Sequence, residues 1–414
     1  MFMMSFFEIP KGVITKLDYY RSRFYWRGGK DKKKYHLAKW DILCRPKDQG
    51  GLGIADLETK NKCLLSKWLF KLLNEDGLWQ SLLRNKYLST KSLTQAVIKP
   101  HDSHFWKGLM NVRDQFLACD SFIVEDGSQT RFWEDIWIDQ RPFSELYPNL
   151  YQVVRHPHDT IETVMSITPL NISFRRALVG DKLIEWQNLV AKIVQVNLTN
   201  ARDTFSWNIH KGGKFTVHSM YQSMMDQDIP FNHKLIWKLK IPLKIKIFMW
   251  YLQQGVILTK DNLAKRKWEG SKLCCFCNSN ETIQHVLFDC HHAKTIWRVV
   301  HVTTGLNPPR SVSHMLRGWL IEATSKEKKL VLVGAAALCW SIWRCRNDIC
   351  LNNAKYNSFM QAVFRETYWL RYWALLQPEE TRENFRSLSF KLEVAAMELF
   401  ANFGWKFNNR LCLS

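Results

Sequence analysis

The sequence predicts a mainly α-helical protein with small β-hairpins, an α+β chain of helical segments, a compact metal-binding module and a helical C-terminal tail. Apolar residues recur at helical spacing through most of the chain. Two short stretches of alternating polarity surround strong turn signals, and one cluster of cysteine and histidine has the spacing of a metal site. Together these observations favour helices that pack around a small, metal-stabilised core.

Several helices can be placed from the positions of apolar residues alone. Residues 14–26 put Leu17 and Tyr20 on one helical face. The segment after Asp56 carries an apolar stripe, and the Asp56 side chain can cap its first turn. The longest apolar run, 330–343, is shorter than a helix that crosses a bilayer. We therefore expect a buried core helix there, and no membrane association.

Two short β-hairpins are expected between the helical regions. The strands 121–124 and 129–133 flank the Asp-Gly pair at 126–127, which is typical of tight hairpin turns. Apolar and polar residues alternate over 205–209, and the alternation resumes at 215–217 after a glycine-rich turn. Each hairpin is predicted to present an aromatic face to a helical layer.

The charge of the chain is its main departure from an ordinary globular composition. Its 414 residues include 59 Lys and Arg against 38 Asp and Glu, a formal net charge of +21, while 46% of residues are hydrophobic. Residues 1–70 hold fifteen basic and seven acidic residues, and residues 233–272 hold ten and two. A surplus of this size attracts polyanions, so RNA or DNA, bound without sequence specificity, is the expected partner.

Both basic stretches also contain aromatic residues. Exposed rings could stack on unpaired bases, but helical spacing favours a place in the hydrophobic core. The rings are Tyr19, Tyr20, Phe24, Tyr25, Trp26 and Tyr35 in the first stretch, and Trp237, Phe248, Trp250, Tyr251 and Trp268 in the second.

Cys274, Cys277, His285 and Cys290 form the pattern C-x₂-C-x₇-H-x₄-C. Three thiolates and one imidazole close a tetrahedron around Zn²⁺ and leave no position for water or substrate. A site of this kind holds structure and does not catalyse. The sequence therefore predicts a structural zinc module.

The chain between the ligands can be tested for geometry. The two nearer cysteines fit a tight turn, and residues 281–288 are expected to form a short helix capped by Asn280. In an α-helix, five positions separate two side chains by about 140°. The helix must therefore break near Asp289 if His285 and Cys290 are to reach one metal ion.

The choice of ligands leaves alternatives open. Cys275 could replace Cys274, and His291 or His292 could replace Cys290; the cysteines could also be buried thiols of a helical core without metal. The chain has eleven cysteines, and those outside the cluster are scattered. An odd, scattered set disfavours a disulfide framework and favours an intracellular, reducing location, without distinguishing nucleus from cytoplasm.

Two runs of the sequence resemble plant LINE-type (non-LTR) retrotransposon reverse transcriptases, over roughly residues 10 to 350. The first resembles the segment after the polymerase core, and it consists of Trp26-Arg27-Gly28-Gly29, His36-Leu37-Ala38-Lys39-Trp40, Cys44-Arg45-Pro46-Lys47, Gly50-Gly51-Leu52-Gly53-Ile54 and Asp56-Leu57. The second resembles the reverse-transcriptase zinc-binding domain, and it consists of Trp207, Gly213-Lys214-Phe215-Thr216-Val217, Trp237-Lys238-Leu239-Lys240-Ile241-Pro242-Leu243-Lys244-Ile245-Lys246 and Leu258-Thr259-Lys260-Asp261-Asn262-Leu263. The resemblance implies that Cys274, Cys277, His285 and Cys290 are the zinc ligands.

The resemblance and the linkers divide the chain into four expected segments. Residues 1–75 would be a remnant of the thumb or connection region, and 76–230 a connecting α+β region with the hairpins. Residues 231–305 would be the zinc-binding domain, and 306–414 a helical tail rich in tryptophan.

The first functional hypothesis is a non-catalytic, nucleic-acid-associated fragment of a truncated retroelement reverse transcriptase. Its zinc module would support a surface that follows phosphates without regard to base sequence. The cationic residues expected to do so are Lys238, Lys240, Lys244, Lys246, Lys260, Lys265, Arg266 and Lys267.

We expect the chain not to be an enzyme. Polymerases of the resembled family need a Tyr-x-Asp-Asp turn and a further Asp to hold two divalent metal ions, and no Asp-Asp dipeptide occurs here. A ribonuclease H module is not evident either.

Two other hypotheses belong to different classes. The chain could be a zinc-stabilised protein-interaction scaffold that binds no nucleic acid, with a partner at the Trp-rich tail. Alternatively, it could be a subunit of an active enzyme whose polymerase core is supplied by another chain. The oligomeric state is not determined by the sequence.

Overall fold

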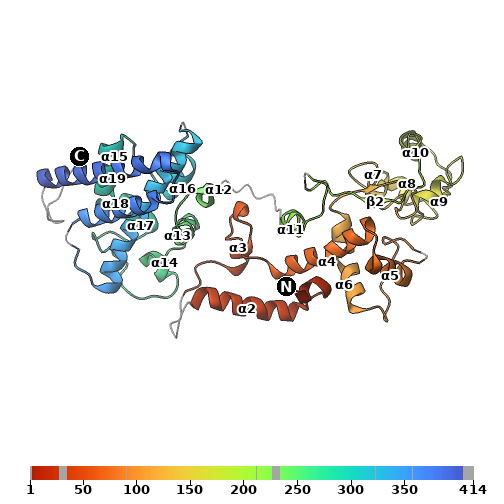
Figure 1. Cartoon of the computed structure of the whole chain (residues 1–414), viewed down its shortest axis with the longest axis horizontal. Coiled ribbons are helices and arrows are strands. Elements are labelled where there is room, and N and C mark those ends of the chain that lie inside the picture. Colours follow the sequence, from red (N-terminus) through yellow and green to blue (C-terminus); the bar gives the residue numbers. More distant parts are fainter. Residues whose placement is uncertain are drawn as a thin grey trace. The chain divides into compact units, whose positions relative to one another are not determined.

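The computed structural model describes residues 2–27, 35–89, 91–210, 212–225, 234–321, 323–356 and 358–403. Within these residues the protein is mainly helical, with a single two-stranded antiparallel sheet (Figure 1). The predicted fold class, mainly α with a small β component, is confirmed. Gly28 and Gly29 of the resembling segment lie outside the described residues.

The chain divides into two compact units. The N-terminal unit consists of Met1–Lys32 and Ala55–Asp228, and the C-terminal unit of Lys33–Ile54 and Ile229–Ser414. The four expected segments, 1–75, 76–230, 231–305 and 306–414, stay a prediction.

Among the described residues, the N-terminal unit contains ten helices and both strands. Its elements are α1 (Phe2–Phe6), α2 (Lys11–Arg27), α4 (Leu57–Asn74), α5 (Leu78–Tyr87), α6 (His104–Leu117), β1 (Phe122–Ile123), α7 (Phe143–Leu146), α8 (Pro148–Tyr151), α9 (Ile161–Met165), α10 (Asp181–Ile193), β2 (Thr204–Phe205) and α11 (Val217–Met225).

Helix α4 is the centre of this unit. Asp56 caps it as expected, because its side chain accepts a hydrogen bond of 2.8 Å from the backbone N–H of Thr59. Its apolar stripe, which includes Leu65 and Leu69, is buried against α6 and α11. The unit also buries a second cluster around Phe132 and Trp133, in the region that carries α7 to α10.

The strands pair differently from the prediction. Each expected hairpin would pair its own two strands, whereas β1 pairs with β2, and Phe122 lies opposite Phe205. One strand of the first predicted hairpin therefore pairs with one strand of the second. The rings of these two residues lie edge to face, with centroids 5.1 Å apart.

A buried carboxylate explains why the first hairpin does not close on itself. Asp203 is 2% exposed and lies next to β2. Its side chain accepts four hydrogen bonds, from the backbone N–H groups of Glu125, Gly127 and Gln129 and from the hydroxyl of Thr130, at 2.8, 2.9, 3.2 and 2.8 Å. The loop that would have turned back onto β1 wraps around this carboxylate instead.

The C-terminal unit contains the long helices. Its elements are α3 (Trp40–Cys44), a 3₁₀ turn η1 (Lys47–Gln49), α12 (Lys234–Lys238), α13 (Leu243–Gln253), α14 (Lys260–Ala264), a π-helical turn η2 (His285–Asp289), α15 (His291–Thr304), α16 (Val312–Arg317), α17 (Ser325–Asn352), α18 (Met360–Ala374) and α19 (Glu379–Phe403).

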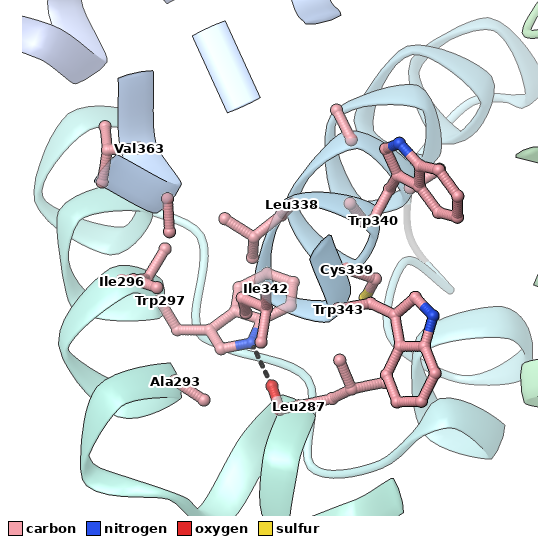
Figure 2. Packing of buried hydrophobic residues seen from close by; sticks show 14 of the residues in the cluster. Leu287, Ala293, Ile296, Trp297, Leu338, Cys339, Trp340, Ile342, Trp343 and Val363 are labelled. Carbon is pink, nitrogen blue, oxygen red and sulfur yellow. Dashed lines mark hydrogen bonds between the residues drawn. The ribbon is translucent and has the colours of Figure 1, made fainter. Parts of the chain in front are cut away.

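One hydrophobic core runs through the C-terminal unit. It joins residues of η2 and α15 with residues of α17, α18 and α19. Figure 2 shows Ile296 and Trp297 of α15 beside Leu338 and Ile342 of α17. The metal-binding segment and the C-terminal helices therefore share their core.

Helix α17 contains the apolar run that was expected to be a core helix. Thr324 and Glu327 form a capping box at its start, and residues from Leu332 to Trp343 are largely buried. Among the described residues, no helix has both the length and the apolar character needed to cross a membrane.

Candidate metal centre

The first two cysteines of the cluster lie on a tight turn. The backbone N–H of Cys274 donates to the carbonyl of Ser279 at 2.8 Å, which closes a loop around Cys277. Inside the loop, the backbone N–H of Phe276 lies 3.4 Å from the sulfur of Cys274 and points a donor at it. The turn therefore brings two thiols together and supplies one of them with a hydrogen bond.

A π-helical turn positions the other two residues. The backbone N–H of Cys290 donates to the carbonyl of His285 at 2.7 Å, a bond across five residues in place of the usual four. This wider turn offsets the rotation of about 140° that an α-helix would put between the two side chains. Cys290 then leaves helical geometry, with φ −58° and ψ 140°, before α15 begins.

The cap of this turn differs from the expectation. The hydroxyl of Thr282, and not the side chain of Asn280, accepts the hydrogen bond from the backbone N–H of His285, at 3.0 Å. Asn280 instead pairs with Leu273 in an antiparallel bridge. The helical segment is correspondingly shorter than the predicted range 281–288.

The four side chains converge on one point. Their ligand atoms all lie within 4.8 Å of one another. The sulfur of Cys290 is 3.9 Å from the sulfurs of both Cys274 and Cys277, and the sulfur of Cys277 is 3.1 Å from Nε2 of His285. A tetrahedral Zn²⁺ with Zn–S bonds of about 2.3 Å separates two sulfurs by about 3.8 Å, so the geometry fits such an ion.

The thiols influence one another. Hydrogen bonds from Cys275 and Cys290 hold the pKa of the Cys274 thiol far below its ordinary value. The hydrogen bond to Cys274 and burial raise the pKa of Cys290 far above it. A thiolate is the form that a metal ion binds.

The alternative ligands lie in other environments. His292 is fully buried, and its ring stacks on Phe276 with centroids 4.1 Å apart. Burial lowers the pKa of His292 to about 3, so it is neutral. His291 is exposed at the start of α15. Cys275 forms a second, smaller group with Cys274 and Glu281 whose ligand atoms also lie within 4.8 Å of one another.

A buried ion pair, which the sequence reasoning missed, joins this turn to α17. Glu281 is 0% exposed, and its carboxylate accepts hydrogen bonds of 2.5 to 3.3 Å from the guanidinium of Arg346. The same carboxylate also accepts from the backbone N–H of Lys260, at 2.9 Å. The two charged partners are 65 residues apart, so no local pattern connects them.

A tryptophan of α15 donates a hydrogen bond to the π-helical turn. The indole N–H of Trp297 donates to the carbonyl of Leu287 at 2.8 Å, the dashed line in Figure 2. A π-helical turn leaves carbonyls without their usual partners. Trp297 therefore satisfies one of these groups and holds α15 against the turn.

The eight predicted cationic residues separate into two groups. Five have exposed side chains, and three are half-buried. The exposed residues are Lys238, Lys240, Lys244, Lys265 and Lys267, and the half-buried residues are Lys246, Lys260 and Arg266.

Each half-buried cation bonds to a backbone carbonyl. Lys246 donates to Trp237 at 3.0 Å, and Lys260 to Leu273 at 2.5 Å. Arg266 donates to the carbonyl of His36 at 2.7 Å. These three side chains therefore hold the fold as well as contributing positive charge.

The predicted core position of the aromatic residues holds only in part. Trp26, Phe248 and Trp250 are buried, whereas Tyr19, Tyr20, Phe24 and Tyr35 are exposed. In the second basic stretch, Trp237, Tyr251 and Trp268 are half-buried. The tryptophans of the tail lie largely inside: Trp340 and Trp343 are each 9% exposed and Trp373 is 0% exposed.

An aromatic pocket lies within the C-terminal unit. It has a volume of about 580 Å³, and its lining includes Tyr35, Tyr251, Trp268, Trp340, Trp343 and Lys244. The ammonium of Lys244 lies 5.5 Å from the ring centroid of Trp340, and the guanidinium of Arg266 lies 5.7 Å from that of Tyr35. Positive charge therefore borders the aromatic surface.

A closed set of three thiols and one imidazole on a helical scaffold defines a class, the structural metal-binding modules. Residues 215–297 match the family described as zinc-binding in reverse transcriptase, and they include the whole cluster. The chain is also 30% identical over 148 residues to "Uncharacterized mitochondrial protein" of Arabidopsis thaliana, a match that covers 35% of this chain and 96% of that protein. The chain belongs to the family that carries the zinc-binding domain of reverse transcriptases.

A second relative matches most of the chain. The "Putative ribonuclease H protein" of Arabidopsis thaliana is 28% identical over 369 residues, which is 83% of this chain. The match covers 57% of that relative, so the chain spans little more than half of its length.

This relative corrects one prediction. We expected the chain not to be an enzyme and ribonuclease H to be absent, whereas a protein named for ribonuclease H matches it over 83% of its length. The expectation was wrong because it relied on missing local motifs. Carboxylates that act together are brought together by the fold from separate elements, so their spacing in a sequence does not identify them.

Proposed function

We propose that the C-terminal unit holds one Zn²⁺ at Cys274, Cys277, His285 and Cys290 and binds single-stranded RNA or DNA beside it. In this proposal the chain derives from a plant LINE-type (non-LTR) retroelement and acts inside the cell, in a reducing environment. The metal ion would fix the turn and the start of α15 and would not meet the nucleic acid. The name of the ribonuclease H relative supports nucleic acid as the class of partner.

The observation that carries the proposal is the aromatic pocket with its bordering cations. Bases stack on aromatic rings whatever their identity, and Lys and Arg follow the phosphates. Tyr35 is 40% exposed, and Lys244 is exposed at the start of α13. A base could stack in this pocket while its phosphate meets Lys244.

The remaining exposed lysines extend the cationic surface. Lys265 lies 3.7 Å from the carboxylate of Asp261 and stays largely exposed, and Lys267 follows it on the same short segment. Exposed ion pairs of this kind are weak, so Lys265 can exchange its carboxylate for a phosphate at little cost.

The proposal is tested by fluorescence anisotropy of a labelled oligo(dT) and a labelled oligo(U) at several salt concentrations. We expect the logarithm of the affinity to fall linearly with the logarithm of the salt concentration, and Lys244→Gln to reduce that slope by about 0.7. Tyr35→Leu should weaken binding at every salt concentration by about 1 to 3 kcal/mol, because it removes a stacking surface and no charge.

The matched control is Lys391→Gln, which removes an exposed lysine from α19 of the same unit. It should leave the slope and the affinity close to wild type. A wild-type slope near zero, or equal losses for Lys244→Gln and Lys391→Gln, would contradict the proposal.

A further inference from the structure

A second cavity in the C-terminal unit is separate from the aromatic pocket and from the metal cluster. Residues of α15, α17, α18 and α19 line it, and its volume is about 130 Å³. Its walls are almost entirely apolar and include Trp297, Trp319, Leu330 and Leu388. An apolar cavity of roughly 150 Å³ accepts benzene in another protein, so the volume suits one small aromatic ring.

One acidic side chain lines this apolar cavity. Glu366 of α18 is 2% exposed, and its Oε2 has no hydrogen-bond partner among the described residues. Burial raises the pKa of its carboxyl well above the ordinary value. A buried polar atom without a partner costs free energy. A ligand that donates a hydrogen bond to this oxygen would therefore remove that cost on binding.

The two indoles and the hydroxyl of the wall already have hydrogen-bond partners. The indole N–H of Trp297 donates to the carbonyl of Leu287 at 2.8 Å, and that of Trp319 to the carbonyl of Asn307 at 2.6 Å. The hydroxyl of Thr304 donates to the carbonyl of Val300 at 2.7 Å. Asn384 lines the cavity at an exposed position, so Glu366 is the buried side chain of the wall whose oxygen lacks a partner among the described residues.

A glycine keeps the space open. Gly334 lies inside α17 and lines the cavity, and a Cβ added there would meet no atom within 4 Å. Glycine inside a helix costs about 1 kcal/mol relative to alanine, and neither a turn nor a close contact requires it here. The free space beside Gly334 continues the cavity.

We propose that this cavity binds one small, neutral aromatic molecule with a single N–H donor, a compound of the indole class, whose N–H donates to Oε2 of Glu366. The apolar walls suit an aromatic body and disfavour an ion, which would lose its hydration on entry. Both forms of a carboxyl, charged and neutral, accept a hydrogen bond, so a donor suits the site in either state. The proposal does not depend on nucleic-acid binding.

The test is isothermal titration of the full chain with indole and with indene, which has the same shape but lacks the N–H. We expect indole to bind about tenfold more tightly than indene, the effect of one hydrogen bond to a buried acceptor. Equal affinities, or no binding of either compound to the wild type, would overturn the proposal.

Three variants locate the site. Glu366→Leu should remove the preference for indole while both compounds still bind, and Glu366→Gln, which keeps an acceptor oxygen, should retain it. Gly334→Leu should abolish binding of both compounds, because its side chain enters the cavity; retained binding would place the ligand elsewhere and overturn the proposal. Circular dichroism and zinc content check that each variant is folded. If a variant does not fold, the comparison of indole with indene on the wild type still tests the proposal.

Discussion

The two units fix their irregular segments with buried polar groups of different kinds. In the N-terminal unit, the single carboxylate of Asp203 accepts hydrogen bonds from four residues of the loop 125–130. In the C-terminal unit, the segment between α14 and α15 is held by the four converging side chains and by the pair of Glu281 and Arg346. The first arrangement needs only the chain, whereas the second would be completed by a metal ion that replaces the thiol protons.

The two units are therefore sensitive to different conditions. A carboxylate that accepts backbone N–H groups works in any environment that keeps it charged. A cluster of thiols depends on the supply of metal and on the redox state of its surroundings. The two units should therefore respond independently to chelators, oxidants and substitutions.

Metal loss should have the largest effect. Cys277→Ser removes one of the four proposed ligands, and we expect the purified wild type to contain one zinc and the variant to contain none. The stability of the C-terminal unit should fall by more than about 5 kcal/mol, because the binding free energy of a structural zinc contributes to folding. Zinc content and hydrogen exchange of both units measure this.

The N-terminal unit is the internal control. Its amides should keep their wild-type protection in Cys277→Ser and after chelation. Equal loss of protection in both units would show that they unfold together and would contradict their independence.

Removal of one partner of the buried ion pair should have the next largest effect. Arg346→Met leaves the Glu281 carboxylate buried without its partner, so the C-terminal unit should lose about 3 to 5 kcal/mol in denaturant unfolding. Adding Glu281→Gln removes the stranded charge and should restore part of the loss. A double variant that is less stable than Arg346→Met would contradict this explanation.

The substitution Asp203→Ala should act on the N-terminal unit alone. It leaves three backbone N–H groups without their acceptor, and we expect a loss of about 2 to 4 kcal/mol. Zinc content should stay at the wild-type level. Asp181→Ala, which removes an exposed aspartate of the same unit, should change stability by less than about 1 kcal/mol.

The sequence predicted local features well and distant contacts poorly. Helical periodicity identified α2 and α4, the latter with its Asp56 cap, and the length of the apolar run 330–343 identified α17 as a core helix. The spacing of the cysteines and histidine identified side chains that the structure brings within 4.8 Å of one another. These signals are contained in fewer than about twenty residues each, the scale on which sequence patterns are informative.

Two of the failures involve partners that are far apart in the chain. Asp203 meets a loop more than seventy residues earlier, and this contact, not the Asp-Gly turn, decides how the strands pair. Glu281 and Arg346 are 65 residues apart. The surplus of basic residues in 233–272 predicted a cationic surface there. It did not predict that Lys246, Lys260 and Arg266 would donate hydrogen bonds to backbone carbonyls.

The π-helical turn at His285–Asp289 contains one residue more than an α-helical turn of the same span. The bond that closes it, from the N–H of Cys290 to the carbonyl of His285, also ends the helix, because Cys290 has φ −58° and ψ 140° before α15 begins. Deletion of one residue between Val286 and Asp289 would still leave His285 and Cys290 on one side of a helix, four positions apart. It would remove this end point, however, so α15 would start elsewhere and Trp297 would no longer lie over the carbonyl of Leu287. The extra residue therefore fixes the point at which the chain passes from the four converging side chains to the hydrophobic core.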